Sequence, residues 1–196
     1  MTNTYRNRPV RAGVGRLVAA LAGTALLLAG CSNSDDVARP AAATTASFNE
    51  ADVAFAQGMI PHHEQALTMA ALAQKAGATA PVLRLAGEIE AAQDPEIALM
   101  RGWLLRWNRP TAMPAMDHSQ MTGMTSDADL ARLRALHGRA FDRLFLTLMR
   151  AHHLGAIEMA RTEQREGSSL EAKALAQRIE SAQAAEVKRI EALLAQ

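Results

Sequence analysis

Apolar residues recur along this chain with helical spacing, and the same pattern is present twice. Residues 55–70 (FAQGMIPHHEQALTMA) and 145–160 (FLTLMRAHHLGAIEMA) match position by position at an offset of ninety residues. In both segments apolar residues follow one another at intervals of three and four, which is the spacing of one face of an α-helix. The match continues from residues 85–104 to residues 175–194. The repeated unit is therefore a pair of helices.

Residues that favour helix ends divide the chain into four predicted helices, over residues 49–76, 81–107, 127–166 and 169–195. The first helix is expected to begin near Asn49 and to end at Gly77, and the third to begin at Ser126 or Asp127 and to end at Gly167. A single hairpin cannot bury its own apolar face, whereas two hairpins can bury theirs against each other. The sequence therefore predicts an all-α fold, an antiparallel four-helix bundle built from two repeated hairpins.

The first thirty residues have the pattern of an export signal. Arginines precede the apolar run of residues 17–28, which is too short for a membrane-spanning helix. The small residues before Cys31 resemble the bacterial lipoprotein signal, in which the chain is cut before a cysteine that then carries lipid. An ordinary signal peptide with an incidental cysteine is the alternative. The predicted divisions are a signal peptide over 1–30, a flexible tether from lipidated Cys31 over 31–47, and a helical domain over 48–196.

Cysteine content and charge narrow the function. Cys31 is the only cysteine, which excludes an internal disulfide and a thiolate metal site. The predicted signal peptide carries four arginines and no acidic residue, so its removal lowers the formal net charge from +1 to about −3. Nucleic-acid binding would require a basic surface, and we therefore do not expect it.

The side chains that recur in both hairpins suit a soft metal ion. In each repeat a methionine lies three residues before a pair of adjacent histidines, and the candidate donors are Met59, His62, His63, Met149, His152 and His153. On a helix, His62 and His152 face inward, while His63 and His153 flank the seam between helices. Thioether and imidazole together favour copper, as Cu(I) or Cu(II), with Cu(I) preferred.

A carboxylate is expected beside each histidine pair. If the chain reverses near Thr79, Glu96 lies level with His63 on the neighbouring helix, and the repeat places Glu186 in the same way. Helical spacing also puts Glu96 on the inward stripe with Ala92. We expect the nitrogen and sulfur donors of both hairpins to converge inside the bundle at one height. A buried carboxylate needs a partner, and a metal-binding imidazole commonly donates to one. The residues expected to orient the imidazoles or to act as additional donors are Glu96, Glu186, Met100, Met69 and Met159. The alternatives are that the methionines only fill the core and that the histidines only bind these carboxylates.

Residues 108–125 join the predicted hairpins at about 49–107 and 127–195. This segment contains two prolines and no helical periodicity, so we expect a loop. Its donors form a further candidate copper site, made of Met113, Met116, His118, Met121 and Met124. Thioethers need no deprotonation and hold Cu(I) where acid would protonate imidazole. The alternative is an apolar lid at one end of the bundle.

The sequence resembles the exported "domain of unknown function 305" family of ferritin-like four-helix bundles over about 49–195. The resemblance is carried by Asp52, Phe55, Met59, His62, His63, Ala66, Met69 and Ala70, by Gln93, Glu96, Ile97, Met100, Trp103 and Leu104, and by Met149, His152 and His153. It implies a bacterial envelope protein associated with copper handling, which binds the ion through Met and His and turns over no substrate. The second hairpin departs from the pattern, with Ile190 and Leu193 in place of Met100 and Trp103.

Together, these features predict an extracytoplasmic lipoprotein that is held to the membrane through Cys31. It binds copper for sequestration, tolerance or delivery, with an envelope copper chaperone or transporter as a further partner. The expected protein is not an enzyme. One alternative is an envelope scaffold that uses exposed methionines to bind partners. A ferritin-like di-iron oxidase is disfavoured, because the chain lacks the Glu-x-x-His motif of such sites.

Overall fold

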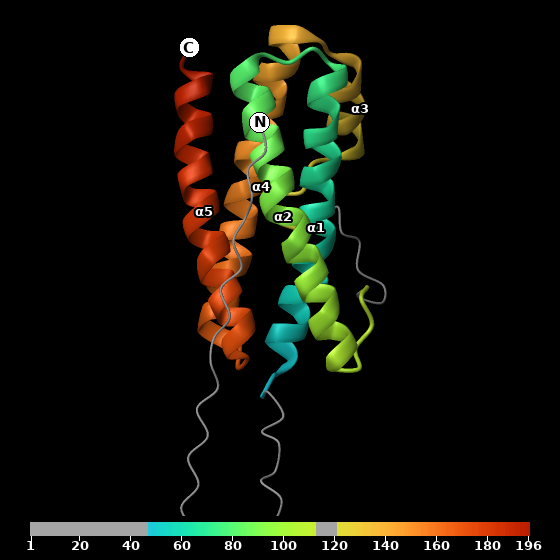
Figure 1. Ribbon diagram of the computed structural model, residues 1–196, viewed down its shortest axis with the longest axis vertical. Helices are drawn as coiled ribbons and strands as arrows, with labels where there is room; N and C mark the ends of the chain where they lie inside the picture. The colour runs from blue at the N-terminus through green and yellow to red at the C-terminus, as the bar shows by residue number, and fades with distance from the viewer. Residues whose placement is uncertain (1–46, 113–120) are drawn as a thin grey trace, which may run out of the picture. The chain divides into compact units, whose positions relative to one another are not determined.

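The computed structural model describes residues 47–112 and 121–196. In that part of the chain it contains helices and no strand, which confirms the predicted all-α fold (Figure 1). The helices are α1 (Glu50–Lys75), α2 (Ala80–Arg106), α3 (Asp127–Ala135), α4 (Gly138–Glu166) and α5 (Leu170–Leu194). The predicted signal peptide, the tether and the lipidated Cys31 lie outside the described residues. None of the described helices is long and apolar enough to cross a membrane.

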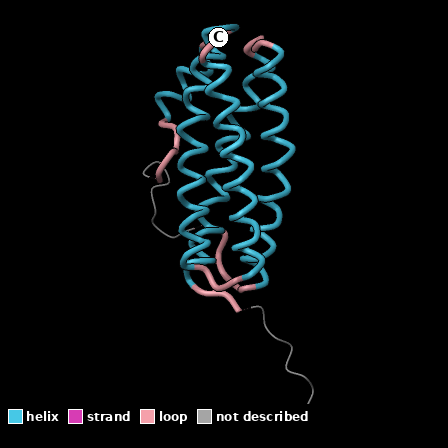
Figure 2. The backbone as a smooth tube through the Cα atoms, turned by 90° about the vertical axis from the view of Figure 1, so that its left-hand side faces the viewer, coloured by secondary structure: helices cyan, strands magenta, loops and turns pink. Residues whose placement is uncertain are grey.

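The long helices pack as two hairpins joined through their first helices. Helix α1 packs against α2 and α4, and α4 packs against α5 (Figures 1 and 2). Contacts between α1 and α4 show that these two helices are antiparallel. Near the start of α1, Asp52 accepts hydrogen bonds from the backbone of Ser168, whereas the Gly138 N–H donates to the Ala76 carbonyl oxygen at the other end (2.8 Å). The connection from α2 to α4 therefore has to return along the helices.

Sequence-predicted helix ends are reproduced at the start of α1 and corrected in the middle of the chain. Asn49 caps α1, since its side chain accepts the backbone N–H groups of Ala51 and Asp52 (3.0 and 3.1 Å). The single predicted helix over 127–166 is wrong. It is divided into α3 and α4 by extended backbone at Leu136 and His137, followed by Gly138 at φ +54°.

Burial explains this break. Leu130 and Leu133 of α3 are buried in the same apolar cluster as residues of α1, α2 and α4. They reach it because α3 lies against both α1 and α4, which a straight continuation of α4 would prevent. The left-handed conformation at Gly138 favours glycine, because it carries no Cβ. Burial of two leucines thus outweighs the helix propensity of this segment.

Each hairpin holds the turn of the other through a repeated aspartate. Asp52 of α1 accepts from the backbone N–H groups of Ser168 and Ser169, at the turn between α4 and α5. Asp142, its counterpart in the repeat, accepts from the backbone N–H of Thr79 at the turn between α1 and α2 (3.2 and 3.3 Å). These reciprocal bonds fix the two hairpins in register, and that register positions the histidines.

The core consists of two apolar clusters with the four histidines between them along the helices. On α1 one cluster ends at Ile60 and the other begins at Ala66, so His62 and His63 fall in the gap. On α4 the clusters meet across Met149 and Ala156, and His152 and His153 fall between them. We call these four residues the histidine layer.

Candidate metal site

The histidine layer is completely buried. All four side chains have a relative exposure of 0 %. His62 of α1 and His152 of α4 lie against each other where the two hairpins meet, with ring centroids 3.7 Å apart and ring planes inclined by 37°. The inward-facing histidines of the repeat are therefore in direct contact. The site is built equally from both hairpins.

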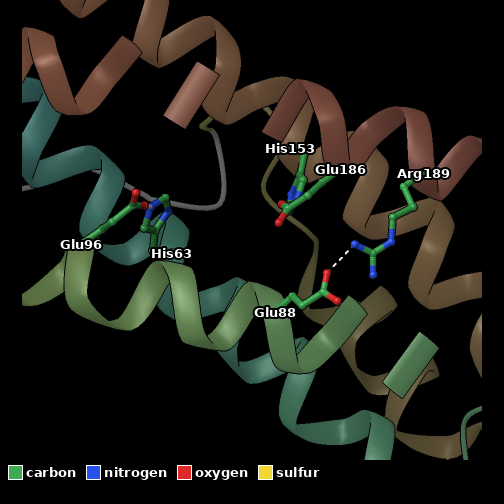
Figure 3. Close-up of polar contacts among 6 residues, drawn as sticks. All are labelled: His63, Glu88, Glu96, His153, Glu186 and Arg189. Atoms are coloured by element: carbon green, nitrogen blue, oxygen red, sulfur yellow. Dashed lines mark hydrogen bonds and ion pairs between the residues drawn. The ribbon is translucent and has the colours of Figure 1, made fainter. Parts of the chain in front are cut away.

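The outer histidine of each pair is bound by the carboxylate that the sequence predicted beside it (Figure 3). His63 Nε2 lies 2.7 Å from Glu96 Oε2 of α2, and His153 Nε2 lies 2.6 Å from Glu186 Oε2 of α5. An ionised carboxylate can only accept, so Nε2 carries the proton in each ring. In its neutral form, such a ring presents a free lone pair at Nδ1. This is the arrangement in which a carboxylate orients a metal-binding imidazole.

Glu96 does not occupy the place on α2 that the spacing suggested. It was expected on the inward stripe together with Ala92, but Ala92 is exposed and the Glu96 side chain keeps 21 % of its surface accessible. The buried residue between the two apolar clusters of α2 is Gln93. Glu96 thus reaches His63 from the edge of the helix, where water still solvates part of its charge.

Burial keeps the inner histidines neutral. Desolvation is the largest cause that lowers the pKa of His62 to about 3, and the charges of His63 and His153 add to it. The backbone of Thr122 raises this pKa and offsets only part of the effect. Desolvation also brings the pKa of His152 well below its ordinary value, together with the charges of His62, His153 and His63. Both rings therefore keep their lone pairs at any physiological pH, which is the state that binds a metal ion.

By distance and angle, six ring nitrogens of the layer have no hydrogen-bond partner among the residues that the structure describes, although the Thr122 backbone lies close enough to His62 to affect its pKa. They are both nitrogens of His62, both of His152, and Nδ1 of His63 and of His153. A buried polar group without a partner costs about 1–3 kcal/mol, so this is an expensive way to fill a core. The arrangement is understandable if the layer exists to bind an electron-pair acceptor.

The methionines lie on both sides of the histidine layer rather than within it. Met59 and Met100 belong to one apolar cluster, and Met149 and Met69 belong to the other. Met159 is partly buried against the cluster of Met59. We expected sulfur and nitrogen donors of both hairpins at one height. Because α1 and α4 are antiparallel, equivalent methionines instead point to opposite sides of the layer.

The segment before α3 lies against the histidine layer. The Thr125 hydroxyl donates to the Met69 sulfur (3.6 Å), so this sulfur already has a partner. Met121 and Met124 are half-buried. The other donors of the predicted loop site, Met113, Met116 and His118, lie outside the described residues.

The α2–α5 side is joined by an ion pair near one carboxylate of the site. Arg189 of α5 binds Glu88 of α2 (Figure 3). Arg189 follows Glu186 by about one turn of α5. In addition, no group of three or more His, Cys, Asp or Glu side chains in the described ranges is arranged to hold an ion.

Sequence reasoning missed a buried acid pair at the end of the bundle near Asn49. Desolvation, a hydrogen bond to Asp52 and the charge of Asp52 raise the pKa of Glu163 to about 8, although Lys173 opposes this. Burial alone would raise the pKa of Asp52. Hydrogen bonds from Glu163 and the backbone of Asn49, Ser169 and Ser168 lower it instead. The two carboxyl groups come together where α1 meets α4, and the Glu163 oxygens have no other partner in the described residues.

The chain matches one family of known proteins and several solved structures. The sequence pattern of the family described as "Domain of unknown function (DUF305)" matches residues 52–194. A secreted DUF305 protein from Streptomyces coelicolor is 31 % identical with a TM-score of 0.71, covering 74 % of this chain and 92 % of that one. A DUF305 fragment from Deinococcus radiodurans is 33 % identical with a TM-score of 0.69, covering 75 % of this chain and 97 % of that one. No curated protein matches the chain.

A third similar structure is that of CopM in its Cu(I)-bound form. It is 30 % identical with a TM-score of 0.61, and the match covers 72 % of this chain and 94 % of CopM. CopM has also been solved in Cu(II)-bound and Ag-bound forms.

Proposed function

The chain belongs to the DUF305 family, and from this premise we propose that it is an exported copper-binding protein rather than an enzyme. The observation that carries the proposal is the buried contact between His62 and His152. Two neutral imidazoles meet between the hairpins, and their nitrogens lack partners in the described part of the chain. A metal ion that accepts their lone pairs would satisfy them.

The donor chemistry supports copper, with Cu(I) preferred. Imidazole suits copper in both oxidation states, and thioether sulfur favours the soft Cu(I) ion. The similar protein CopM has been solved with Cu(I), Cu(II) and Ag. Ag(I) shares the softness and charge of Cu(I), which makes it a suitable probe. The fold in this proposal is a ferritin-like antiparallel four-helix bundle.

The residues of the site would have distinct roles. His62 and His152 would bind the ion at the interface between hairpins, and His63 and His153 would offer their Nδ1 atoms. Glu96 and Glu186 would hold the outer rings in the metal-binding tautomer. The donors that would add sulfur from above and below the layer are Met59, Met149, Met69, Met100 and Met159.

The site lies in a protein that we propose to be exported and lipid-anchored through Cys31. Support for export comes from the basic and apolar start of the chain and from the similar secreted protein of Streptomyces coelicolor. An extracytoplasmic copper chaperone or transporter would supply or receive the ion. Sequestration, tolerance and delivery all require the same reversible binding.

Cu(I) titration against a competing chelator, under anaerobic conditions, tests the proposal. The mature chain is compared with a variant that carries His62→Leu, His63→Leu, His152→Leu and His153→Leu, and we expect this variant to lose tight binding. His137→Leu, which changes an exposed histidine outside the layer, is the control and keeps full affinity. Unchanged stoichiometry and affinity in the layer variant would refute copper binding by the histidines.

Thermal unfolding with and without Cu(I) separates this function from a metal-independent scaffold. A ligand that binds only the folded chain raises the midpoint of unfolding, so copper is expected to raise it in the native chain and not in the layer variant. An unchanged midpoint in both would favour the scaffold. Iron in the purified protein together with oxygen consumption would favour an oxidase.

A further inference from the structure

Two positions at which the copies of the internal repeat differ lie on one face of the α1–α4 seam. Gln65 on α1 corresponds to Gly155 on α4, and Gly58 on α1 corresponds to Leu148 on α4. Both Gln65 and Gly155 contact residues 121–125, which we call the strap. The hairpins are duplicated but the strap occurs only once, so it contacts α1 and α4 differently. This explains why the residues of the two copies differ where they contact the strap.

The backbone of the strap explains the difference between Gln65 and Gly155. A Cβ atom at Gly155 would lie 2.1 Å from the Thr122 carbonyl oxygen, so α4 and the strap touch backbone to backbone. Gln65 holds the other end, accepting from the Thr125 N–H (2.7 Å) and donating to the Thr125 carbonyl oxygen (2.9 Å). Between these points Gly123 packs on the carbonyl oxygen of His152. The strap is thus fixed directly over the histidine layer.

The difference between Gly58 and Leu148 has another cause. The atoms nearest to a Cβ at Gly58 would be two methionine methyl carbons, that of Met159 at 3.0 Å and that of Met121 at 3.3 Å. No strap backbone is found within reach of Gly58 in the described residues, unlike at Gly155. The missing side chain therefore makes room for thioether side chains from two different segments. Leu148, at the equivalent place in the repeat, leaves no such space.

We propose that Met121 and Met159 form an outer binding site for a soft monovalent cation, Cu(I) or Ag(I), on the way to the histidine layer. Both methionines are half-buried, so water and solutes reach them, whereas the histidines are fully enclosed. Gly58 precedes His62 by one helical turn, roughly 6 Å along α1. The residue after Met121 is Thr122, whose backbone lies beside His62.

The chemistry of the outer site restricts its ligand. Two thioethers carry no charge and no proton to lose, so they bind a soft monovalent ion reversibly and over a wide pH range. Hard divalent cations prefer oxygen ligands and would not be retained. This inference rests on the proposed copper binding, and it adds a route by which the ion reaches the buried layer.

The test uses the full mature chain with ¹³C-labelled methionine methyl groups and ¹⁵N-labelled histidine, titrated with Ag(I) and followed by NMR. After Ag(I) is mixed with the protein, we expect the Met121 and Met159 methyl signals to change at earlier times than the histidine signals. The variant Met121→Leu with Met159→Leu keeps the apolar volume and is expected to fill the histidine layer roughly tenfold more slowly, as the loss of a modest binding energy would predict. Leu105→Ala, which changes an exposed apolar residue of α2 outside both sites, is the control and fills at the native rate.

Gly58→Ala provides a variant that leaves every sulfur in place. Alanine favours a helix interior over glycine, so the variant is expected to fold, while its methyl group occupies the space between the two thioethers. We expect weaker Ag(I) shifts at Met121 and Met159. If these methyl signals stay unchanged while the histidine signals shift, or if the double leucine variant fills at the native rate, the outer site is refuted and copper binding by the histidines stands. If no histidine signal responds either, the proposed function fails as well.

Discussion

His62 and His152 occupy the same position in the two halves of the repeat, and their imidazole rings meet with centroids 3.7 Å apart. Neither ring has a hydrogen-bond partner in the ranges that the structure describes, and burial lowers the pKa of both. Two polar rings therefore lie against each other in an apolar interior whose described residues offer no hydrogen bond to either. The chain without metal carries this cost in its folded state, and the cost can be measured.

The double substitution His62→Leu with His152→Leu is expected to stabilise the metal-free protein and to weaken its copper binding. Leucine removes the desolvated nitrogens, each of which costs about 1–3 kcal/mol, and leaves an apolar side chain of similar size between two apolar clusters. Urea unfolding of both proteins at pH 7, without metal, measures the difference in free energy of unfolding. A variant that is less stable than the native chain would show that the rings are satisfied in the folded state.

Replacement of the carboxylates should weaken metal binding without removing a ligand. In Glu96→Gln and Glu186→Gln the amide no longer fixes the proton on Nε2 of His63 or His153, and loss of such a partner typically lowers metal affinity about 10- to 100-fold. Chelator competition with Cu(I) gives the affinity of each variant. Glu64→Gln is the matched control, because Glu64 pairs with Arg101 on the same two helices and is exposed. Equal affinities in all three variants would contradict an orienting role.

The stability of the metal-free chain is expected to decrease as the pH falls below 6.5. The pKa of His62 is lowered from 6.5 to about 3, so the unfolded chain takes up a proton in this window and the folded chain does not. His152 acts in the same direction. Each histidine contributes up to about 1.4 kcal/mol per pH unit, and above pH 6.5 this dependence disappears. Urea unfolding between pH 7 and pH 5 measures the slope. A slope that persists unchanged in the double leucine variant would assign it to other groups.

The carboxyl pair of Asp52 and Glu163 is expected to make the protein less stable as the pH rises, which is the opposite of the effect of the histidines. The pKa of Glu163 is raised from 4.5 to about 8, so its stabilisation is complete below pH 4.5 and is lost as the pH rises through 8. Glu163→Gln keeps a hydrogen-bond donor for Asp52 at every pH and is expected to remove this loss. Unfolding free energies at pH 6.5, 7.5 and 8.5 test the expectation, with the exposed Glu166→Gln as the control. A native chain whose stability does not fall over this range would contradict a protonated Glu163.

The repeat made the hairpins and the histidine–carboxylate pairs predictable. Two copies of one pattern can bury their apolar faces only against each other, and counting residues from the turn places Glu96 beside His63. Both inferences use local geometry, because helical rise and short turns determine which residues are level. The structure has the corresponding hydrogen bonds in both hairpins.

Features that depend on contacts between distant segments were not predictable in this way. Asp52, which raises the pKa of Glu163, lies far from it in the sequence, and no periodicity relates the two residues. Nothing in the residues before α3 indicates that Thr122 lies against Gly155. The break at Leu136 follows from burial of Leu130 and Leu133, which the continuous helical pattern concealed. Met59 and Met149 lie on opposite sides of the histidine layer because α1 and α4 are antiparallel. The direction of α4 relative to α1 has to be known before this placement can be predicted.

The close approach of Gly155 to the strap allows a final prediction. In Gly155→Ala the new Cβ would lie 2.1 Å from the Thr122 carbonyl oxygen and 2.8 Å from Gly123 Cα, so the strap has to move away from α4. Overpacking of this kind destabilises by about 1–3 kcal/mol, even though alanine favours a helix. Gly87→Ala is the matched control, because this exposed helical glycine has no atom within 4 Å of its Cβ position in the described residues, and there alanine should stabilise by about 0.5–1 kcal/mol. Urea unfolding measures the change in the free energy of unfolding in each variant, which we expect to be a decrease for Gly155→Ala and an increase for Gly87→Ala. The same sign for Gly155→Ala as for Gly87→Ala would mean that the strap is held less tightly over the histidine layer than the structure shows.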